Sequence, residues 1–291
     1  MRKILLIGGS GQLGSALQNT AKNFDFKIVA PVHDELDACD PENIDKFLDK
    51  EKADLLINAS AYVKVPKCED EPMEALRLNS VAVRDMARLS KKKNIRFVTY
   101  STCYVFDGEC NEPYAEDDRP NPLQMYGISK FAGELVARNY YPENSFVIRT
   151  GALYGGGLKG SAKGNFVLDV LNESKEKEVI ERSSEQFINP TYAGSLAFAS
   201  LELLLKNPEP GIYHLNEEGY ASWDEFAREI LKLSGSDIKV LGVDRDGRSG
   251  EMKRPKFGVL SNNKAKKYGV VLPPWREGLK SYLAEINKIK V

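Results

Sequence analysis

The sequence contains very few of the residues on which metal centres and disulfide-rich folds depend. Among its 291 residues there are two histidines, His33 and His214, and four cysteines, at positions 39, 68, 103 and 110. No two cysteines have the CxxC spacing of a zinc or redox motif, so we expect reduced thiols in a cytosolic protein. A Ser-His-Asp hydrolase and a histidine-rich metal site are both poorly supported.

Long apolar runs and an excess of one charge are also missing. The chain has 41 Lys and Arg against 42 Asp and Glu, for a formal net charge of -1. Nothing in this balance indicates a nucleic-acid or membrane partner. No apolar stretch approaches the ~20 residues that span a bilayer, and the run at 4–7 leads directly into glycines, unlike a signal peptide. We therefore expect a cytoplasmic globular protein with one large domain or two modest ones.

Short apolar runs alternate with helical patterns through the first half. Strands are predicted at 3–7, 27–32, 53–58 and 96–101, and helices at 15–23, 74–92 and 123–139. This alternation predicts an α/β fold, a Rossmann-type doubly wound parallel sheet.

A glycine-rich turn follows the first predicted strand. Gly8, Gly11 and Gly14 form a GxxGxxG pattern between strand and helix, where backbone free of side chains can approach a pyrophosphate at a helix N-terminus. About twenty residues further on, Asp34 and Glu35 occupy the place where an acid can bind an adenosine ribose. The segment from 31 to 36 contains no Lys or Arg to hold a 2'-phosphate. The cofactor is therefore expected to be NADH or NADPH, with a slight preference for NADH.

Hydroxyl groups and a Tyr-Lys pair come after the fourth predicted strand. Thr102 stands at the end of that strand, where its hydroxyl can donate to a substrate oxygen. Tyr126 and Lys130 are four residues apart on a predicted helix and so lie on one face. A nearby ammonium ion stabilises phenolate, so this pair is suited to proton transfer at a carbonyl or alcohol oxygen.

The second half carries weaker signals. Helices are predicted over 165–171 and 192–205 and a strand over 211–216, in which His214 is interpreted as structural. Ser222 and Glu225 have the spacing of a capping box. Five basic residues cluster in one loop, either as a solvated surface or as a grip on a diphosphate: Arg245, Arg248, Lys253, Arg254 and Lys256.

Together these motifs resemble a known family. The chain is similar to the extended short-chain dehydrogenase/reductases and, among them, to the dTDP-4-dehydrorhamnose reductase family. The similarity rests on GxxGxxG at 8–14, Asn-Ala-Ser-Ala-Tyr at 58–62, Ser-Thr-x-Tyr-Val-Phe-Asp-Gly at 101–108, YxxxK at 126–130, Asn-Pro-Thr-Tyr at 189–192, Lys-Arg-Pro at 253–255 with Leu260, and Leu-Pro-Pro-Trp at 272–275.

The resemblance implies a dinucleotide-binding domain over residues 1–150 and a smaller, mainly substrate-binding domain over 151–291, with later segments around 179–216 returning to the first domain. It also implies reduction of a 4-keto-6-deoxy sugar carried on a nucleoside diphosphate, with hydride from a nicotinamide. Tyr126 would protonate the carbonyl oxygen, Lys130 would lower the pKa of Tyr126 and bind the nicotinamide ribose, and Thr102 would orient the carbonyl. The implied cofactor-binding residues are Gly8, Ser10, Gly11, Gln12, Leu13, Asp37, Ala59, Ala61, Tyr62, Tyr126 and Lys130. The implied substrate-binding residues are Val65, Thr102, Cys103, Tyr104, Ala152 and Arg254.

Departures from the family pattern cluster near the implied sugar pocket. Cys103 stands where the family usually has Asp, Ala152 where it usually has Trp, and Pro66 where Asp is frequent. Some members bridge dimers through magnesium on a glutamate early in the first helix. The matching residue here is Ala16, so we predict no such metal site. A homodimer without the metal stays open.

Two other functions stay open. A non-catalytic, cofactor-binding regulatory subunit of a partner enzyme would explain Cys103 and Ala152, although the retained Tyr126 and Lys130 argue against it. A nucleotide-sugar epimerase or dehydratase would use the same fold while keeping its cofactor bound through turnover.

Overall fold

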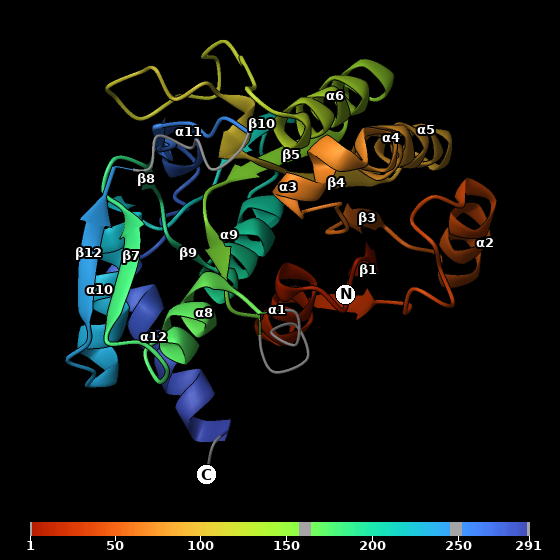
Figure 1. Ribbon diagram of the computed structural model, residues 1–291. Coiled ribbons are helices and arrows are strands. Elements are labelled where there is room, and N and C mark those ends of the chain that lie inside the picture. Colours follow the sequence, from red (N-terminus) through yellow and green to blue (C-terminus); the bar gives the residue numbers. More distant parts are fainter. Residues whose placement is uncertain (1, 157–163, 245–251, 290–291) are drawn as a thin grey trace.

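The computed structural model of the protein describes residues 2–156, 164–244 and 252–289. Its central sheet consists of six strands: β1 (Arg2–Ile7), β2 (Phe26–Val29), β3 (Leu55–Asn58), β4 (Arg96–Thr102), β5 (Ser145–Thr150) and β10 (Gly211–His214). They lie in the order β10-β5-β4-β3-β1-β2, and every neighbouring pair is parallel (Figure 1). The predicted Rossmann-type parallel sheet is confirmed. The chain changes direction across the sheet between β1 and β3, the position where such folds bind ligands.

Helices cover both faces of this sheet. On one face lie α1 (Gln12–Thr20) and α9 (Ala193–Leu205), and on the other α2 (Pro41–Glu51), α5 (Ala82–Lys93) and α6 (Met125–Tyr140) (Figure 1). The strand residues alternate accordingly: Ile4 and Leu6 belong to the first core, Leu5 and Ile7 to the second. Because both faces are buried, the strands read as continuous apolar runs in the sequence.

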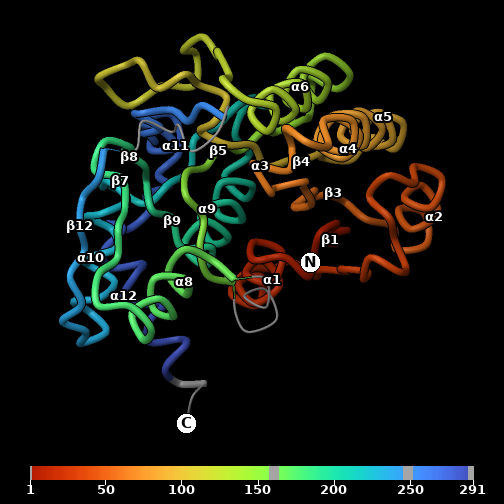
Figure 2. The backbone as a smooth tube through the Cα atoms, in the orientation of Figure 1, coloured from red at the N-terminus to blue at the C-terminus, as the bar shows by residue number. Residues whose placement is uncertain are grey.

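A second, smaller group of elements surrounds its own core. It comprises β7 (Val179–Ser183) paired with β12 (Lys239–Val243), and β8 (Phe187–Ile188) between β11 (Ala221–Ser222) and β13 (Phe257–Gly258). Helices α8 (Phe166–Glu173), α10 (Trp223–Ser234) and α12 (Trp275–Ile289) pack around them. Figure 2 shows β7 and β12, far apart in the sequence, side by side. Of the segments around 179–216 that are expected to return to the first domain, β10 joins the central sheet and α9 packs on it, whereas β7 pairs outside it.

The remaining elements are short connections. They are η1 (Ala21–Asn23), α3 (Val65–Asp70), α4 (Pro72–Leu76), η2 (Arg77–Val81), η3 (Cys103–Val105), β6 (Leu153–Tyr154), β9 (Thr191–Tyr192) and α11 (Asn263–Lys266). Among the residues that the model describes, no helix has the length and apolar character needed to cross a bilayer.

Most predicted boundaries hold within a few residues, and the exceptions have local causes. Strand β2 stops at Val29, three residues short of the prediction, where Pro31 has no N–H to continue the ladder. Helix α6 begins at Met125 because the side chain of Gln124 accepts from the Gly127 amide at 2.6 Å. The helix predicted over 74–92 is interrupted by the π-helical turn η2. The predicted capping box of Ser222 and Glu225 is confirmed.

A buried carboxyl group joins the two groups of elements. Glu217, fully buried after β10, accepts from the Tyr192 amide at 3.2 Å and from the Ser195 hydroxyl at 2.6 Å, at the start of α9. A side chain at Gly278 of α12 would overlap its carboxylate. Burial, which disfavours the charged form, raises the pKa of Glu217 to about 7.

This raised pKa predicts a stability that falls with pH. The folded protein binds the Glu217 proton more tightly than the unfolded chain, so the stabilisation is complete below about pH 4.5 and disappears as pH rises through 7. Replacing Glu217 with Gln should remove roughly 3 kcal/mol of this decline and raise the melting temperature at pH 8. Thermal unfolding from pH 4.5 to 8, with Glu112→Gln at an exposed position as control, tests this. An unchanged slope in Glu217→Gln contradicts it.

Candidate active site

The glycine turn between β1 and α1 is built for close backbone approach. Gly8 has φ of +82° and lies against the backbone of Ala59 and Ser60, which follow β3. A side chain at Gly14 would overlap the Gly8 carbonyl oxygen. Gly11 begins α1 without a side-chain cap, so no side chain occupies the N–H groups of the first turn. This arrangement fits the pyrophosphate of a dinucleotide.

The other predicted cofactor residues lie around this turn or behind it. Ser10 is exposed in the turn, Gln12 opens α1 and Leu13 is buried in the core. The backbone of Gly156, after β6, packs on that of Gln12, so the second group of elements reaches the turn. In the loop after β2, Asp37 accepts from the Cys39 amide at 2.9 Å.

Beyond β3, the segment with Ala59, Ala61 and Tyr62 is clamped by a residue that the sequence did not single out. The Asn79 side chain accepts from the Tyr62 amide at 2.9 Å and donates to the Tyr62 carbonyl at 3.1 Å. It also donates to the Ser129 hydroxyl at 2.9 Å, on the helix that carries Tyr126. Asn79 is buried in the π-helical turn, so this clamp joins β3 to α6.

The three predicted catalytic residues meet at the carboxyl end of β4. Thr102 is the last residue of β4, and its hydroxyl oxygen accepts from the Tyr104 amide at 3.2 Å and is hydrogen-bonded to the Tyr126 side chain. Tyr126 and Lys130 lie one turn apart on α6, and Lys130 is 5% exposed. The Tyr104 ring meets the Tyr126 ring edge-on, with centroids 5.9 Å apart.

Burial determines the protonation of this group. It raises the pKa of Tyr126 well above its ordinary value, with the Cys103 thiol adding to the shift and the Thr102 hydrogen bond opposing it. Desolvation of the phenolate sets the net direction of this shift, and the expected lowering of the Tyr126 pKa by Lys130 stays a prediction. Burial also lowers the pKa of Lys130 to about 8. At neutral pH the site thus contains a neutral phenol, which can donate a proton, beside an ammonium ion.

The predicted substrate-binding residues lie in several different surroundings. Val65 opens α3, and Tyr104 lies near Arg254, whose charge opposes the burial that raises the pKa of Tyr104 to about 12. Ala152 is partly buried against the second core, and its carbonyl accepts from the Thr191 amide at 2.9 Å. Cys103 is 3% exposed and packs in a small apolar cluster with Val105, Phe106, Tyr114 and Leu260.

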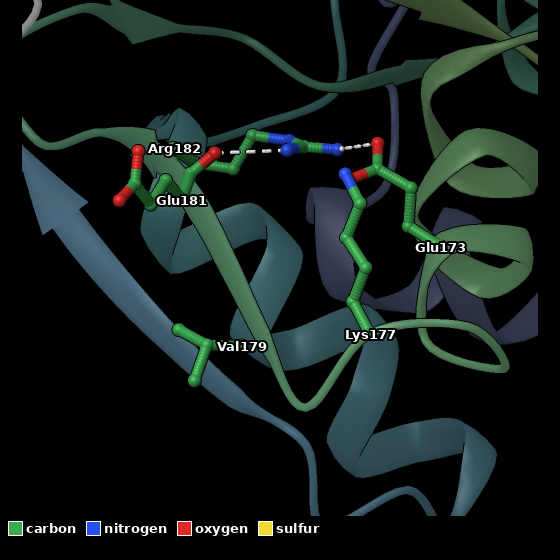
Figure 3. A pocket seen from close by; sticks show the side chains of 5 residues that line it. All are labelled: Glu173, Lys177, Val179, Glu181 and Arg182. Carbon is green, nitrogen blue, oxygen red and sulfur yellow. Dashed lines mark hydrogen bonds and ion pairs between the residues drawn. The ribbon is translucent and has the colours of Figure 1, made fainter.

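Arg254 also lines a pocket of about 610 Å³ between the second group's helices. Phe166 and Trp223 stand in its wall with ring centroids 4.5 Å apart, and the Arg182 guanidinium lies over Phe166 at 5.4 Å. An adjoining pocket of about 410 Å³ contains Glu173, which pairs with Lys177 at 2.9 Å and with Arg182 at 2.6 Å (Figure 3). Of the predicted basic loop, Arg245 and Arg248 lie outside the described residues.

A family model described as the RmlD substrate binding domain matches residues 1–288. The chain belongs to this family. The resemblance to the dTDP-4-dehydrorhamnose reductases, within the extended short-chain dehydrogenase/reductases, is thereby confirmed.

Similar proteins with names and structures span the whole chain. The spore coat polysaccharide biosynthesis protein SpsK of Bacillus subtilis is 33% identical, covering 98% of both chains. A dTDP-4-dehydrorhamnose reductase of Mycolicibacterium smegmatis is 31% identical, covering 98% of this chain and 86% of its own. The crystal structure of a Bacillus anthracis dTDP-4-dehydrorhamnose reductase in complex with NADP is 30% identical, with a TM-score of 0.91 over 98% of this chain and 100% of that one.

Within this family, the departures of the present chain fall into different surroundings. Cys103 sits in an apolar cluster, where a carboxylate without hydrogen-bond partners would be costly; its contact with the sugar stays a prediction. Ala152 packs at the edge of the second core, and its place in the sugar pocket stays a prediction. Ala16 is 5% exposed and packs in the first core, and the absence of a metal site stays a prediction.

Two glycines of the same turn provide a matched test of the backbone approach. Gly14→Ala should lower the free energy of unfolding by about 1–3 kcal/mol, because its Cβ would overlap the Gly8 carbonyl. Gly11→Ala should fold almost as stably, because its Cβ would lie 3.4 Å from the same oxygen, an ordinary contact. Urea unfolding without cofactor measures both. Equal losses in the two variants would show that helix–strand packing does not require Gly14.

Proposed function

We propose that this protein reduces the 4-keto group of a 6-deoxy sugar nucleotide with NAD(P)H. The substrate is dTDP-4-dehydrorhamnose or a close relative with another sugar. The observation that carries the proposal is the convergence of Thr102, Tyr126 and Lys130 at the end of β4, with the glycine turn at the end of β1 in the same sheet. The relatives named dTDP-4-dehydrorhamnose reductases support the choice of substrate.

Each catalytic residue has one task. The bound cofactor would supply a hydride from its nicotinamide ring. Its pyrophosphate would be held by Gly8, Gly11 and the start of α1. Tyr126 donates its phenolic proton to the oxygen of the reduced carbonyl, a step for which its raised pKa keeps it in the required acid form. The Thr102 hydroxyl orients that oxygen. Lys130 holds the nicotinamide ribose and provides positive charge near the phenolate that forms.

The nucleoside diphosphate belongs in the pocket beside Arg254. Aromatic side chains, Phe166 and Trp223, offer a surface for a flat base, and Arg254 offers a guanidinium group for phosphate oxygens. Arg254 lies near Tyr104, which contacts Tyr126. A ligand with its base in this pocket can therefore reach the catalytic residues with its sugar.

Replacing Tyr126 with Phe tests the reaction. Removing the proton donor should reduce kcat by about 10²–10⁴-fold while leaving the affinity for cofactor nearly unchanged. Stoichiometric cofactor oxidation with a 4-keto-6-deoxy nucleotide sugar is the assay, and Tyr140→Phe, exposed on the same helix, is the control. Undiminished turnover in Tyr126→Phe would remove the phenol from the mechanism.

The same assay separates the rival functions. A regulatory subunit would oxidise no cofactor with any such sugar but would bind a partner enzyme tightly. An epimerase or dehydratase would convert the sugar without net oxidation of NADH or NADPH. Light scattering of the same preparation measures whether the protein is a homodimer.

The choice between NADH and NADPH has a local origin. Asp34 and Glu35 are exposed in the loop after β2, and Glu35 accepts from the Val32 amide at 3.1 Å. Negative charge there should repel a 2'-phosphate, which favours NADH, although the Bacillus anthracis relative contains NADP.

Replacing both acidic residues with serine tests this preference. The unmodified protein should have a higher kcat/KM with NADH. The variant Asp34→Ser/Glu35→Ser should gain about fivefold to tenfold with NADPH and change little with NADH. Steady-state kinetics with both cofactors decides it, and a native preference for NADPH would contradict the prediction.

A further inference from the structure

A buried ion pair lies one helical turn beyond the catalytic lysine. Glu134 of α6 is 2% exposed and Arg149 of β5 is 1% exposed. The guanidinium donates to both carboxylate oxygens, Nε to Oε1 at 2.9 Å and Nη2 to Oε2 at 2.7 Å. Such a two-bond grip fixes the orientation of the carboxylate as well as its position. A buried pair costs desolvation and often adds little stability, so its presence here calls for a functional reason.

Arg149 is itself fixed from the other side. Its Nη1 lies 3.3 Å from His214 Nε2, and the guanidinium stacks over Phe106 at 5.0 Å. His214 Nδ1 lies 3.1 Å from the Tyr114 carbonyl oxygen, to which it donates, so Nε2 accepts from Arg149. Burial and the Arg149 charge lower the pKa of His214 to about 3, which keeps the imidazole neutral. Arg149 thus has one anionic partner, Glu134, among the described residues.

Glu134 also acts on Lys130. The two residues are four apart on α6 and therefore neighbours on its surface. Glu134 is the one acidic residue whose charge affects Lys130 among the described residues, and it raises the lysine pKa against the effect of burial. No described hydrogen bond or ion pair joins them, because Arg149 occupies both oxygens of the carboxylate.

We propose that the Glu134–Arg149 pair is a positioning device for Lys130. Glu134 keeps the buried lysine charged, while Arg149 holds the carboxylate so that the ammonium group stays free for the cofactor ribose and Tyr126. The inference rests on the proposed reductase function and adds two residues that touch neither substrate nor cofactor.

The titratable side chains that act on Tyr126, one helical turn before Lys130, have raised pKa values. Burial raises the pKa of Cys68 on α3 to about 11 and those of Cys103 and Tyr104 after β4 to about 12, and it raises that of Tyr126 further. Burial lowers the pKa of His214 on β10 to about 3. Glu116, whose pKa burial raises, contacts the His214 amide. A decline of kcat/KM for the cofactor as pH rises through about 8 therefore reports the loss of the Lys130 proton.

The pH dependence of kcat/KM for cofactor tests the device. In Glu134→Gln the lysine loses its anion, so the basic limb should move down by about one pH unit. Activity should fall about fivefold at pH 8 and little at pH 6. Glu134→Asp keeps the charge and should restore the limb to that of the unmodified protein. Equal losses at all pH values in Glu134→Gln would indicate packing alone and overturn the proposal.

Removing the other partner should act in the opposite direction. In Arg149→Met the released carboxylate can bind Lys130 directly, which should raise the basic limb and increase KM for the cofactor severalfold. A downward shift in both variants would overturn the proposal. If Arg149→Met does not fold, the comparison of Glu134→Gln with Glu134→Asp decides alone: a limb that moves equally in both contradicts the proposal.

Failure of the reductase function would be visible separately. If the unmodified protein oxidises no cofactor with any 4-keto sugar, the proposed function fails, and the same variants are compared by calorimetric NADH binding from pH 6 to 9. If NADH binding weakens at a lower pH in Glu134→Gln than in the unmodified protein, the role of the pair is still supported. The same pH dependence of NADH affinity in all variants overturns the proposal.

Discussion

The parallel alignment of the six central strands is the constraint on which the site depends. Because the strands share one direction, the turn after β1, the segment after β3 and Thr102 at the end of β4 all lie along one edge of the sheet. Helix α6 brings Tyr126 and Lys130 to the same edge by packing against β4 and β5. The reversal of strand order between β1 and β3 separates the helices there, and Gly8 and Gly14 let the backbones meet without side chains.

Burial gives this edge its chemistry. The same desolvation keeps the Tyr126 phenol protonated and makes the charge of Lys130 marginal at neutral pH. A proton donor benefits from the first effect, whereas a residue that stabilises developing negative charge is weakened by the second. A fixed anion nearby corrects the second effect without reversing the first, provided that it is not free to bind the lysine. The buried arginine of β5 meets that condition, and this explains why a costly ion pair lies in the wall of the site.

The sequence predicted what depends on local spacing and missed what depends on contacts across the chain. The Tyr126–Lys130 pair and the glycine turn follow from helical periodicity and from one strand–helix unit, so both were identified with their positions. Asn79 and Arg149 act through partners 17 and 15 residues away, at Tyr62 and Glu134, and no spacing rule connects these pairs. The net upward shift of the Tyr126 pKa was missed for the same reason. Proximity to lysine is visible in a sequence, but the depth of burial is a property of the whole fold. Likewise β7 reads as an ordinary strand, and only its partner β12, some sixty residues later, takes it out of the central sheet.

The division of labour between the two groups of elements bears on substrate choice. In the proposed mechanism, proton delivery depends on β4 and α6, whose contacts lie in the central sheet and its helices. The pocket beside Arg254 is built on α8, α10 and the strands around them. Ala152 lies where the chain passes from β5 of the first group to β6 and the second core. A small side chain at that crossing can alter the room for the sugar without disturbing Thr102, Tyr126 or Lys130. Specificity for the sugar can therefore change in this family while the reduction step keeps its geometry, which is the physical reason to separate the reaction from the identity of the sugar.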